Sequence, residues 1–222
     1  MDIKKKKLII FDLDGTLIDS QSDILIANNL TLQKFGYQTI SYKEVKSIIG
    51  QGIMGNIIKS LAMQKVKASN QQKQKMYHYF FSYYKKNVYV KSKPYPGIKN
   101  LLKKLQKNYK LAVCSNKLEK LTKIVLQKSD LKQYFDFVAG GDTFKFKKPH
   151  PSVLNNVVKI FKMSNKDALF VGDSEHDYHA AQNSKIDFCL KQGGYTNKKV
   201  SFFKNANKIK DYKQVKSLII DF

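Results

Sequence analysis

LIIFDLDGTLIDS, residues 8–20, is a short apolar run that ends in two carboxylates, Asp12 and Asp14. An apolar run of this length is typical of a strand buried in a parallel sheet. Side chains at alternate positions of a strand share one face, so the two acids point the same way at its carboxyl end. Gly15 and Thr16 then turn the chain away. Ligands bind at this edge of open α/β sheets, and paired carboxylates there favour a hard divalent cation.

Three later segments of the chain also carry polar side chains that could belong to the same site as Asp12 and Asp14. They are LAVCSNK at 111–117, FKKPHP at 146–151 and LFVGDSEHD at 169–177. Together with residues 8–20, and in the same order, they resemble the four motifs of the haloacid dehalogenase-like superfamily. The resemblance spans most of the chain. It implies a Rossmann-like α/β core, in which helices flank a parallel sheet, with a small all-helical cap inserted after the first strand.

The same resemblance implies a Mg²⁺-dependent phosphomonoester phosphatase. Asp12 would attack phosphorus and form an aspartyl-phosphate, and Asp14 would serve as the acid and then the base. One Mg²⁺ would be held by Asp12, the backbone carbonyl of Asp14 and Asp173, because oxygen ligands suit this ion. Asp177 would orient the waters of the metal without contacting it. For Asp177 alone, an acid placed at a helix start by the helix dipole is an equally good interpretation.

Contacts to the substrate phosphate are expected from strand ends and from one lysine. Ser115 offers a hydroxyl and Asn116 an amide, both suited to phosphoryl oxygens. Lys148 resembles the lysine of the third motif and is assigned a catalytic as well as a binding role. Its neighbour Lys147 is the alternative in register, and we expect it to be solvated. The full set of expected substrate contacts is Gly15, Thr16, Ser115, Asn116 and Lys148.

Chain breakers indicate two domains. The segment KPYPG at 93–97 contains two prolines and a glycine, which interrupt helices and strands. We expect residues 1–17 and 91–222 to form the core and residues 18–90 to form the helical cap. Such a cap would close over the site and exclude water.

Within the expected cap, Ser41 and Glu44 have the spacing of a helix capping box. Gly50-Gln51-Gly52 resembles the substrate-facing cap loop of phosphoglycolate phosphatase-like members, although a plain turn between helices explains it equally well. The aromatic run MYHYFFSYY at 76–84 is interpreted as helix core or a seam between helices, with a ligand cage as the alternative.

After residue 97, helical and strand patterns alternate as they do in parallel sheets. Strands are expected at 111–115, 135–139, 168–173 and 188–190, the last of them completing the sheet. Right-handed crossovers would bring the strand ends carrying Asp12, Ser115 and Asp173 to one edge.

The composition is strongly basic, with a formal net charge of +24, and every one of the 41 basic residues is lysine. Arginine, which forks onto guanine and phosphate, and tryptophan, a common stacking platform, are both absent. The lysines are spread along the whole chain. We interpret them as compositional bias rather than as a nucleic-acid or anionic-surface binding site, which is the alternative functional class. We therefore expect no dedicated nucleic-acid or membrane partner.

The branch within the superfamily depends on a few departures. Asp14 disfavours a dehalogenase, which would lack this acid. Gly172 before Asp173, and the absence of arginine, disfavour a β-phosphoglucomutase-like mutase. The segments PYPG, KPHP and GDSEHD look most like phosphoglycolate phosphatase and its near relatives. The favoured substrate is 2-phosphoglycolate, with pyrophosphate and nucleoside monophosphates as alternatives, and the protein is expected to be a monomer or homodimer.

Localisation is expected to be cytoplasmic. The sequence shows no signal peptide pattern and no apolar run near the ~20 residues that span a bilayer. Cys114 and Cys189 each lie in an apolar run, which indicates two buried thiols in a reducing compartment.

Overall fold

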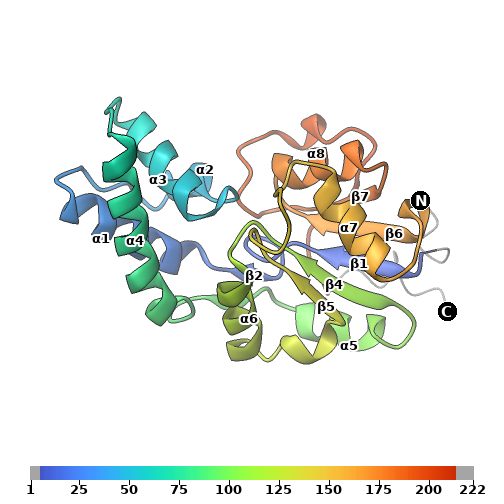
Figure 1. Ribbon diagram of the computed structural model, residues 1–222. Coiled ribbons are helices and arrows are strands. Elements are labelled where there is room, and N and C mark those ends of the chain that lie inside the picture. The colour runs from blue at the N-terminus through green and yellow to red at the C-terminus, as the bar shows by residue number, and fades with distance from the viewer. Residues whose placement is uncertain (1–5, 214–222) are drawn as a thin grey trace.

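A six-stranded parallel sheet forms the centre of the computed structural model, which describes residues 6–213 (Figure 1). The strand order is β5-β4-β1-β6-β7-β8, and every neighbouring pair is parallel. The strands are β1 Leu8–Phe11, β4 Lys110–Cys114, β5 Phe137–Ala139, β6 Ala168–Gly172, β7 Asp187–Lys191 and β8 Asn207–Ile209. The α/β fold with a parallel sheet, expected from the apolar runs, is confirmed.

One expectation about the sheet was wrong. Residues 188–190 were expected to form the last strand, but β8 pairs with the outer side of β7. The β8 segment is Asn-Lys-Ile, and only Ile209 of the three is buried. A three-residue edge strand with one buried side chain lacks the apolar run by which the other strands are recognised.

Helices cover both faces of the sheet. Side chains alternate along β1, so Ile9 and Phe11 belong to one hydrophobic cluster and Leu8 and Ile10 to another. The first cluster includes side chains of α5 Ile98–Leu105 and α6 Glu119–Lys128, and the second those of α7 Ser152–Ile160 and α8 Glu175–Asn183. Burial on both faces explains why the central strands are uniformly apolar. Single 3₁₀ turns lie at Lys132–Tyr134, Asn165–Asp167 and Val200–Phe202.

A separate group of helices lies at one end of the sheet (Figure 1). These are α1 Gln21–Lys34, α2 Val45–Ile48, α3 Gly52–Met63 and α4 Asn70–Asn87. The helix α4 packs against α1 and α3. Ser41 and Glu44, expected to form a capping box, do exchange side-chain-to-backbone hydrogen bonds of 2.7 and 3.3 Å, but these bonds close the turn that leads into α2, whose N-cap residue is Glu44 itself.

The chain enters and leaves this helical group through a short antiparallel pair, β2 Ile18–Asp19 and β3 Lys93–Pro94. The domain limits expected from the sequence, 18 and 90, lie close to this pair, and the division into core and cap stays a prediction. Residues 1–5 and 214–222 of the expected core lie outside the described residues.

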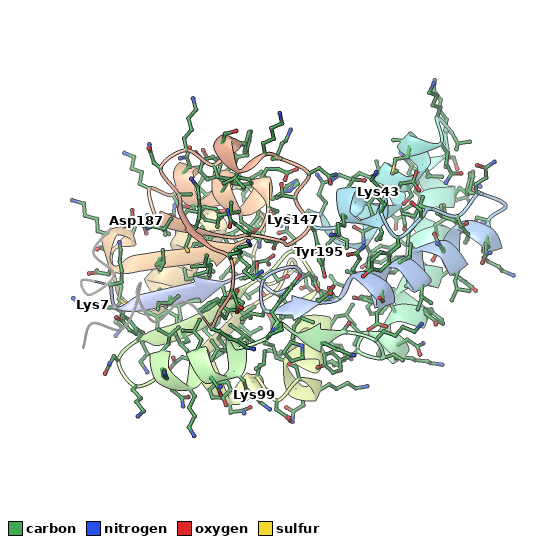
Figure 2. The ribbon with its side chains drawn as sticks, turned by 180° about the vertical axis from the view of Figure 1, so that it is seen from behind. Lys7, Lys43, Lys99, Lys147, Asp187 and Tyr195 are labelled. Atoms are coloured by element: carbon green, nitrogen blue, oxygen red, sulfur yellow. The ribbon has the colours of Figure 1, made fainter. Side chains whose placement is uncertain are left out.

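Exposed lysines lie on widely separated parts of the molecule (Figure 2). Lys7 lies at the end of the core, Lys99 on α5 and Lys43 on the distant helical group. Within residues 6–213, no helix combines the length and the apolar character needed to cross a membrane. Cys114 and Cys189 are both free and buried, as expected.

Candidate active site

The strands β4, β1 and β6 are neighbours inside the sheet, and their carboxyl ends lie side by side at one edge of it. Asp12 follows β1, Ser115 follows β4 and Asp173 follows β6, and all three side chains are buried. These strands are adjacent in the order β4-β1-β6, so the polar residues that follow them must lie close together.

A buried lysine joins two of the acids. Lys148 Nζ lies 2.7 Å from Asp12 Oδ1 and 2.6 Å from Asp177 Oδ1. Burial by itself would lower the pKa of Lys148, but the two carboxylates raise it above its ordinary value. The backbone of Lys148 is held by Asn116, whose Oδ1 accepts from Lys148 N at 2.9 Å and whose Nδ2 donates to Lys148 O at 2.9 Å. Lys148 is therefore a charged, oriented group beside Asp12.

The other acids are oriented by local hydrogen bonds. Asp177 Oδ2 accepts from Ser174 Oγ at 2.6 Å and from Ser174 N at 3.0 Å in the capping box of α8. Asp173 Oδ1 accepts from Thr16 Oγ1 at 2.8 Å, and Asp173 Oδ2 accepts from Tyr195 N at 2.7 Å. Gly15 has a φ of +87°, and a Cβ there would overlap the Asp173 carboxylate. Glycine is needed at this position for both reasons.

The donor set fits a divalent cation. One carboxylate oxygen from each of Asp12, Asp173 and Asp177 lies within 4.8 Å of the others. Burial raises the pKa of Asp12 to about 7 against the opposing effect of Lys148, and burial followed by the charge of Asp177 raises that of Asp173 well above its ordinary value. Three buried carboxylates with one ammonium leave excess negative charge, which a hard cation would neutralise.

Asp14 belongs to a second network. Its Oδ1 accepts from Ser20 Oγ at 2.5 Å and from Lys117 Nζ at 2.6 Å. Lys117 Nζ also donates to the hydroxyl of Tyr84, on α4, at 3.0 Å. Burial alone would lower the pKa of Lys117, but Asp14 and Tyr84 raise it. The side chain of Asp14 is thus linked to the helical group.

The loop 50–52 binds the core at three points. Asn116 Nδ2 donates to Gly50 O at 2.7 Å, Lys147 Nζ donates to Gln51 O at 2.8 Å, and Gln51 Nε2 lies 2.8 Å from His176 Nε2. Lys147 is exposed, as expected, and its amino group is also paired with the carbonyl of Gln51.

A pocket opens between the helical group and these strand ends. Its charged lining consists of Asp12, Asp14, Asp177, Lys117 and Lys148. Its apolar lining comes mainly from the helical group and from the start of α6, namely Ile24, Ile49, Ile53, Phe80, Leu118 and Leu121. The pocket therefore has charged groups at the strand ends and an apolar wall on the side of the helical group.

Comparison with known proteins identifies the family. The family model described as haloacid dehalogenase-like hydrolase matches residues 9–191. The chain belongs to the haloacid dehalogenase-like hydrolase family. The family resemblance of the four sequence motifs is confirmed.

Curated relatives and solved structures of this hydrolase family agree over most of the chain. The phosphoglycolate phosphatase of Aquifex aeolicus is 37% identical over 190 residues, which are 85% of this chain and 86% of the relative. That of Agrobacterium fabrum is 33% identical over 190 residues, covering 85% and 82%. A crystal structure of a predicted phosphoglycolate phosphatase from Haemophilus somnus has a TM-score of 0.89 and 27% identity, and the match covers 96% of this chain and 98% of that one. These relatives support the expected class, a phosphoric monoester hydrolase.

The residues singled out in this haloacid dehalogenase-like sequence converge on the pocket or its wall. The side chains of Asp12, Asp14, Ser115, Asn116, Lys148 and Asp177 line it. Thr16 and Gly15 contact or approach Asp173 instead of facing the substrate space. Both hydrogens of the Asn116 amide are donated to backbone carbonyls, so this side chain holds Lys148 and the loop 50–52 together.

No role was expected for Lys117 or Tyr84 from the sequence. Lys117 is the last residue of the segment LAVCSNK and directly follows Asn116, which is the signal that could have pointed to it. Tyr84 lies in the aromatic run that was interpreted as helix packing, and its buried ring does pack against Phe80. Its hydroxyl nevertheless reaches Lys117.

Proposed function

We propose that this protein hydrolyses a small phosphomonoester with Asp12 as the nucleophile. The observation that carries the proposal is the pair formed by Asp12 and Lys148, buried at the end of β1 beside Asp173 and Asp177. A carboxylate held there, next to a fixed cation, suits attack on an anionic phosphoryl group.

Two steps complete the reaction. An Asp12 oxygen bonds to phosphorus as the bond from phosphorus to the leaving oxygen breaks, and Asp14 donates a proton to that oxygen. Asp14 then takes a proton from water, whose oxygen bonds to phosphorus and releases phosphate from Asp12. Lys148 and the Ser115 hydroxyl stabilise the negative charge of the phosphoryl oxygens.

Mg²⁺ is the cofactor we propose for the acid cluster. Asp12, Asp173 and the backbone carbonyl of Asp14 would hold the ion. Asp177 would lie beside the ion without holding it, fixed by its hydrogen bonds to Lys148 and to Ser174 at the start of α8. When bound, the ion would neutralise the charge that gathers on the phosphoryl group. Thr16 and Tyr195 N hold Asp173 in position for this role.

The helical group of α1 to α4 serves as the cap in this proposal. Its loop 50–52 contacts Asn116, Lys147 and His176, so it covers the pocket on one side. A closed cap excludes water from the aspartyl-phosphate until the leaving group has departed.

We propose 2-phosphoglycolate as the substrate. Support comes from the mixed apolar and charged lining of the pocket and from the relatives that carry the name phosphoglycolate phosphatase. Pyrophosphate and nucleoside monophosphates would be cleaved by the same chemistry and are the alternatives. The proposed partner is therefore a small phosphorylated anion, and we propose a cytoplasmic enzyme without a dedicated nucleic-acid or membrane partner.

Phosphate release tests this function directly. Purified protein is assayed with 2-phosphoglycolate, pyrophosphate and nucleoside monophosphates in Mg²⁺ or in EDTA, and kcat/KM is compared. We expect 2-phosphoglycolate to be preferred, EDTA to abolish turnover, and Asp12→Asn to abolish it with the fold retained. Asp130→Asn is a matched control, because Asp130 lies on the surface, away from the pocket, and its one ion pair within residues 6–213 is with Lys99. Turnover by Asp12→Asn at the wild-type rate would exclude Asp12 as nucleophile.

A further inference from the structure

Lys117 is a buried cation that the proposed reaction does not use. It lines the pocket, and its ammonium is held between Asp14 at 2.6 Å and the Tyr84 hydroxyl at 3.0 Å. Its Nζ also lies 5.2 Å from the centre of the Tyr84 ring. A buried ammonium is costly to desolvate, so its position calls for anionic partners.

The two lysines of the pocket lie at chemically different ends. Lys148 contacts Asp12 and Asp177, the residues at the phosphoryl end. Lys117 contacts Asp14, the proposed proton donor to the leaving oxygen. Among the residues that line this pocket, these two are the only lysines, so one cation serves the phosphoryl group and the other faces the leaving group.

The leaving group brings an anion to this second lysine. In 2-phosphoglycolate the carboxylate carbon is two bonds from the ester oxygen that Asp14 protonates. When the ester oxygen is within reach of Asp14, the carboxylate of the substrate also lies close to the Lys117 ammonium, which contacts Asp14. The surrounding wall, which includes Ile24, Phe80 and Leu121, is apolar and would strengthen a charge-assisted hydrogen bond.

We propose that Lys117, supported by Tyr84, binds the carboxylate of the leaving group and makes the enzyme select phosphomonoesters that carry a second anion there. The inference rests on the proposed phosphatase function and names the residues that choose its substrate. Lys117 donates to the carboxylate, and the Tyr84 hydroxyl both positions Lys117 and can donate its own hydrogen to the same group. Selection by a placed cation discriminates strongly against a substrate without the anion.

A matched pair of substrates tests this role. In 2-phosphoglycolate the terminal group is a carboxylate, and in 2-hydroxyethyl phosphate it is a neutral hydroxymethyl group of similar size. For the wild type we expect kcat/KM for the first to exceed that for the second by about 100-fold or more. In Lys117→Met we expect this ratio to fall by about 30-fold or more, since a buried charge contact to the substrate is lost.

Two further variants sharpen the result. Tyr84→Phe keeps the ring and should lower the ratio by about 5-fold, which is the effect of one hydroxyl. This variant carries the test if Lys117→Met fails to fold. Lys120→Met is the control, because Lys120 is exposed on α6, three residues after Lys117, and this variant should leave the ratio at the wild-type value.

The outcomes separate the inference from the function on which it rests. A wild type that hydrolyses both substrates equally well would overturn the substrate proposal and this inference together. A wild-type preference that persists in Lys117→Met and Tyr84→Phe, with both substrates slowed in proportion, would overturn only the inference. Lys117 would then act through Asp14 alone.

Discussion

Lys148 Nζ and Asp12 Oδ1 form a buried ion pair of 2.7 Å between residues 136 positions apart in the chain. The same ammonium reaches Asp177, so one lysine offsets two carboxylates at the end of β1. These carboxylates would repel an approaching substrate phosphate. Binding of the substrate therefore depends on cations that offset their charge.

Removal of the Lys148 charge should reduce both stability and activity. In Lys148→Met, Asp12 and Asp177 lose their shared buried partner, and we expect a loss of about 3–5 kcal/mol in the free energy of unfolding in EDTA. Urea unfolding measures this loss. The kcat/KM should fall by about 100-fold or more in Mg²⁺, because the cation beside the nucleophile is gone. Lys159→Met, at an exposed position on α7, is the control, and equal stability of the two variants would contradict the structural role of Lys148.

Thr16 should control the affinity for Mg²⁺ without touching the substrate. Thr16→Val keeps the shape of the side chain but removes the 2.8 Å hydrogen bond to Asp173. Loss of a bond that orients a metal ligand typically weakens metal binding by about 10- to 100-fold. The measurement is the Mg²⁺ concentration that gives half-maximal turnover at saturating substrate. An unchanged value would mean that the bond from Tyr195 N alone orients Asp173.

Replacement of Gly15 by alanine should destabilise the protein, because the added Cβ would collide with the Asp173 carboxylate. Gly15 and Gly36 have φ values of +87° and +77°, so alanine pays a similar backbone cost at each. At Gly36 a Cβ would meet nothing within 4 Å, whereas at Gly15 it would overlap Asp173. Thermal unfolding should show Gly15→Ala to be less stable than Gly36→Ala by about 1–3 kcal/mol. Equal losses would indicate that Asp173 can move aside freely.

Both cysteines should be unreactive in the folded protein. Burial raises the pKa of Cys114 and of Cys189 to about 12, so at pH 8 only about one thiol in ten thousand is ionised. A colorimetric disulfide reagent should therefore release no chromophore at pH 8 until urea is added, and two equivalents per chain afterwards. Rapid release from the native protein would show that one of these strands opens to solvent.

The sequence predicted the core of the fold and the acids of the site because both leave local signals. Buried strands are apolar at every position, as in residues 8–11 and 168–172, and such runs are recognisable without knowledge of their neighbours. Asp12 and Asp14 are separated by one residue, and this short spacing can likewise be recognised from the local sequence alone. The edge strand β8 was missed because it is short and polar.

Only the tertiary structure decided which charges meet. Lys117 pairs with Asp14 across 103 positions and with Tyr84 across 33, and no local pattern specifies either contact. Only the tertiary structure shows that Thr16 donates a hydrogen bond to Asp173. It alone also shows that the Asn116 amide donates to the backbone carbonyls of Lys148 and Gly50. Hydrophobic burial along the strands is nearly independent of partner, whereas a hydrogen bond requires two particular atoms within about 3 Å. The local sequence therefore determined the layers and the acids, and the packing of distant segments determined the partner of each acid.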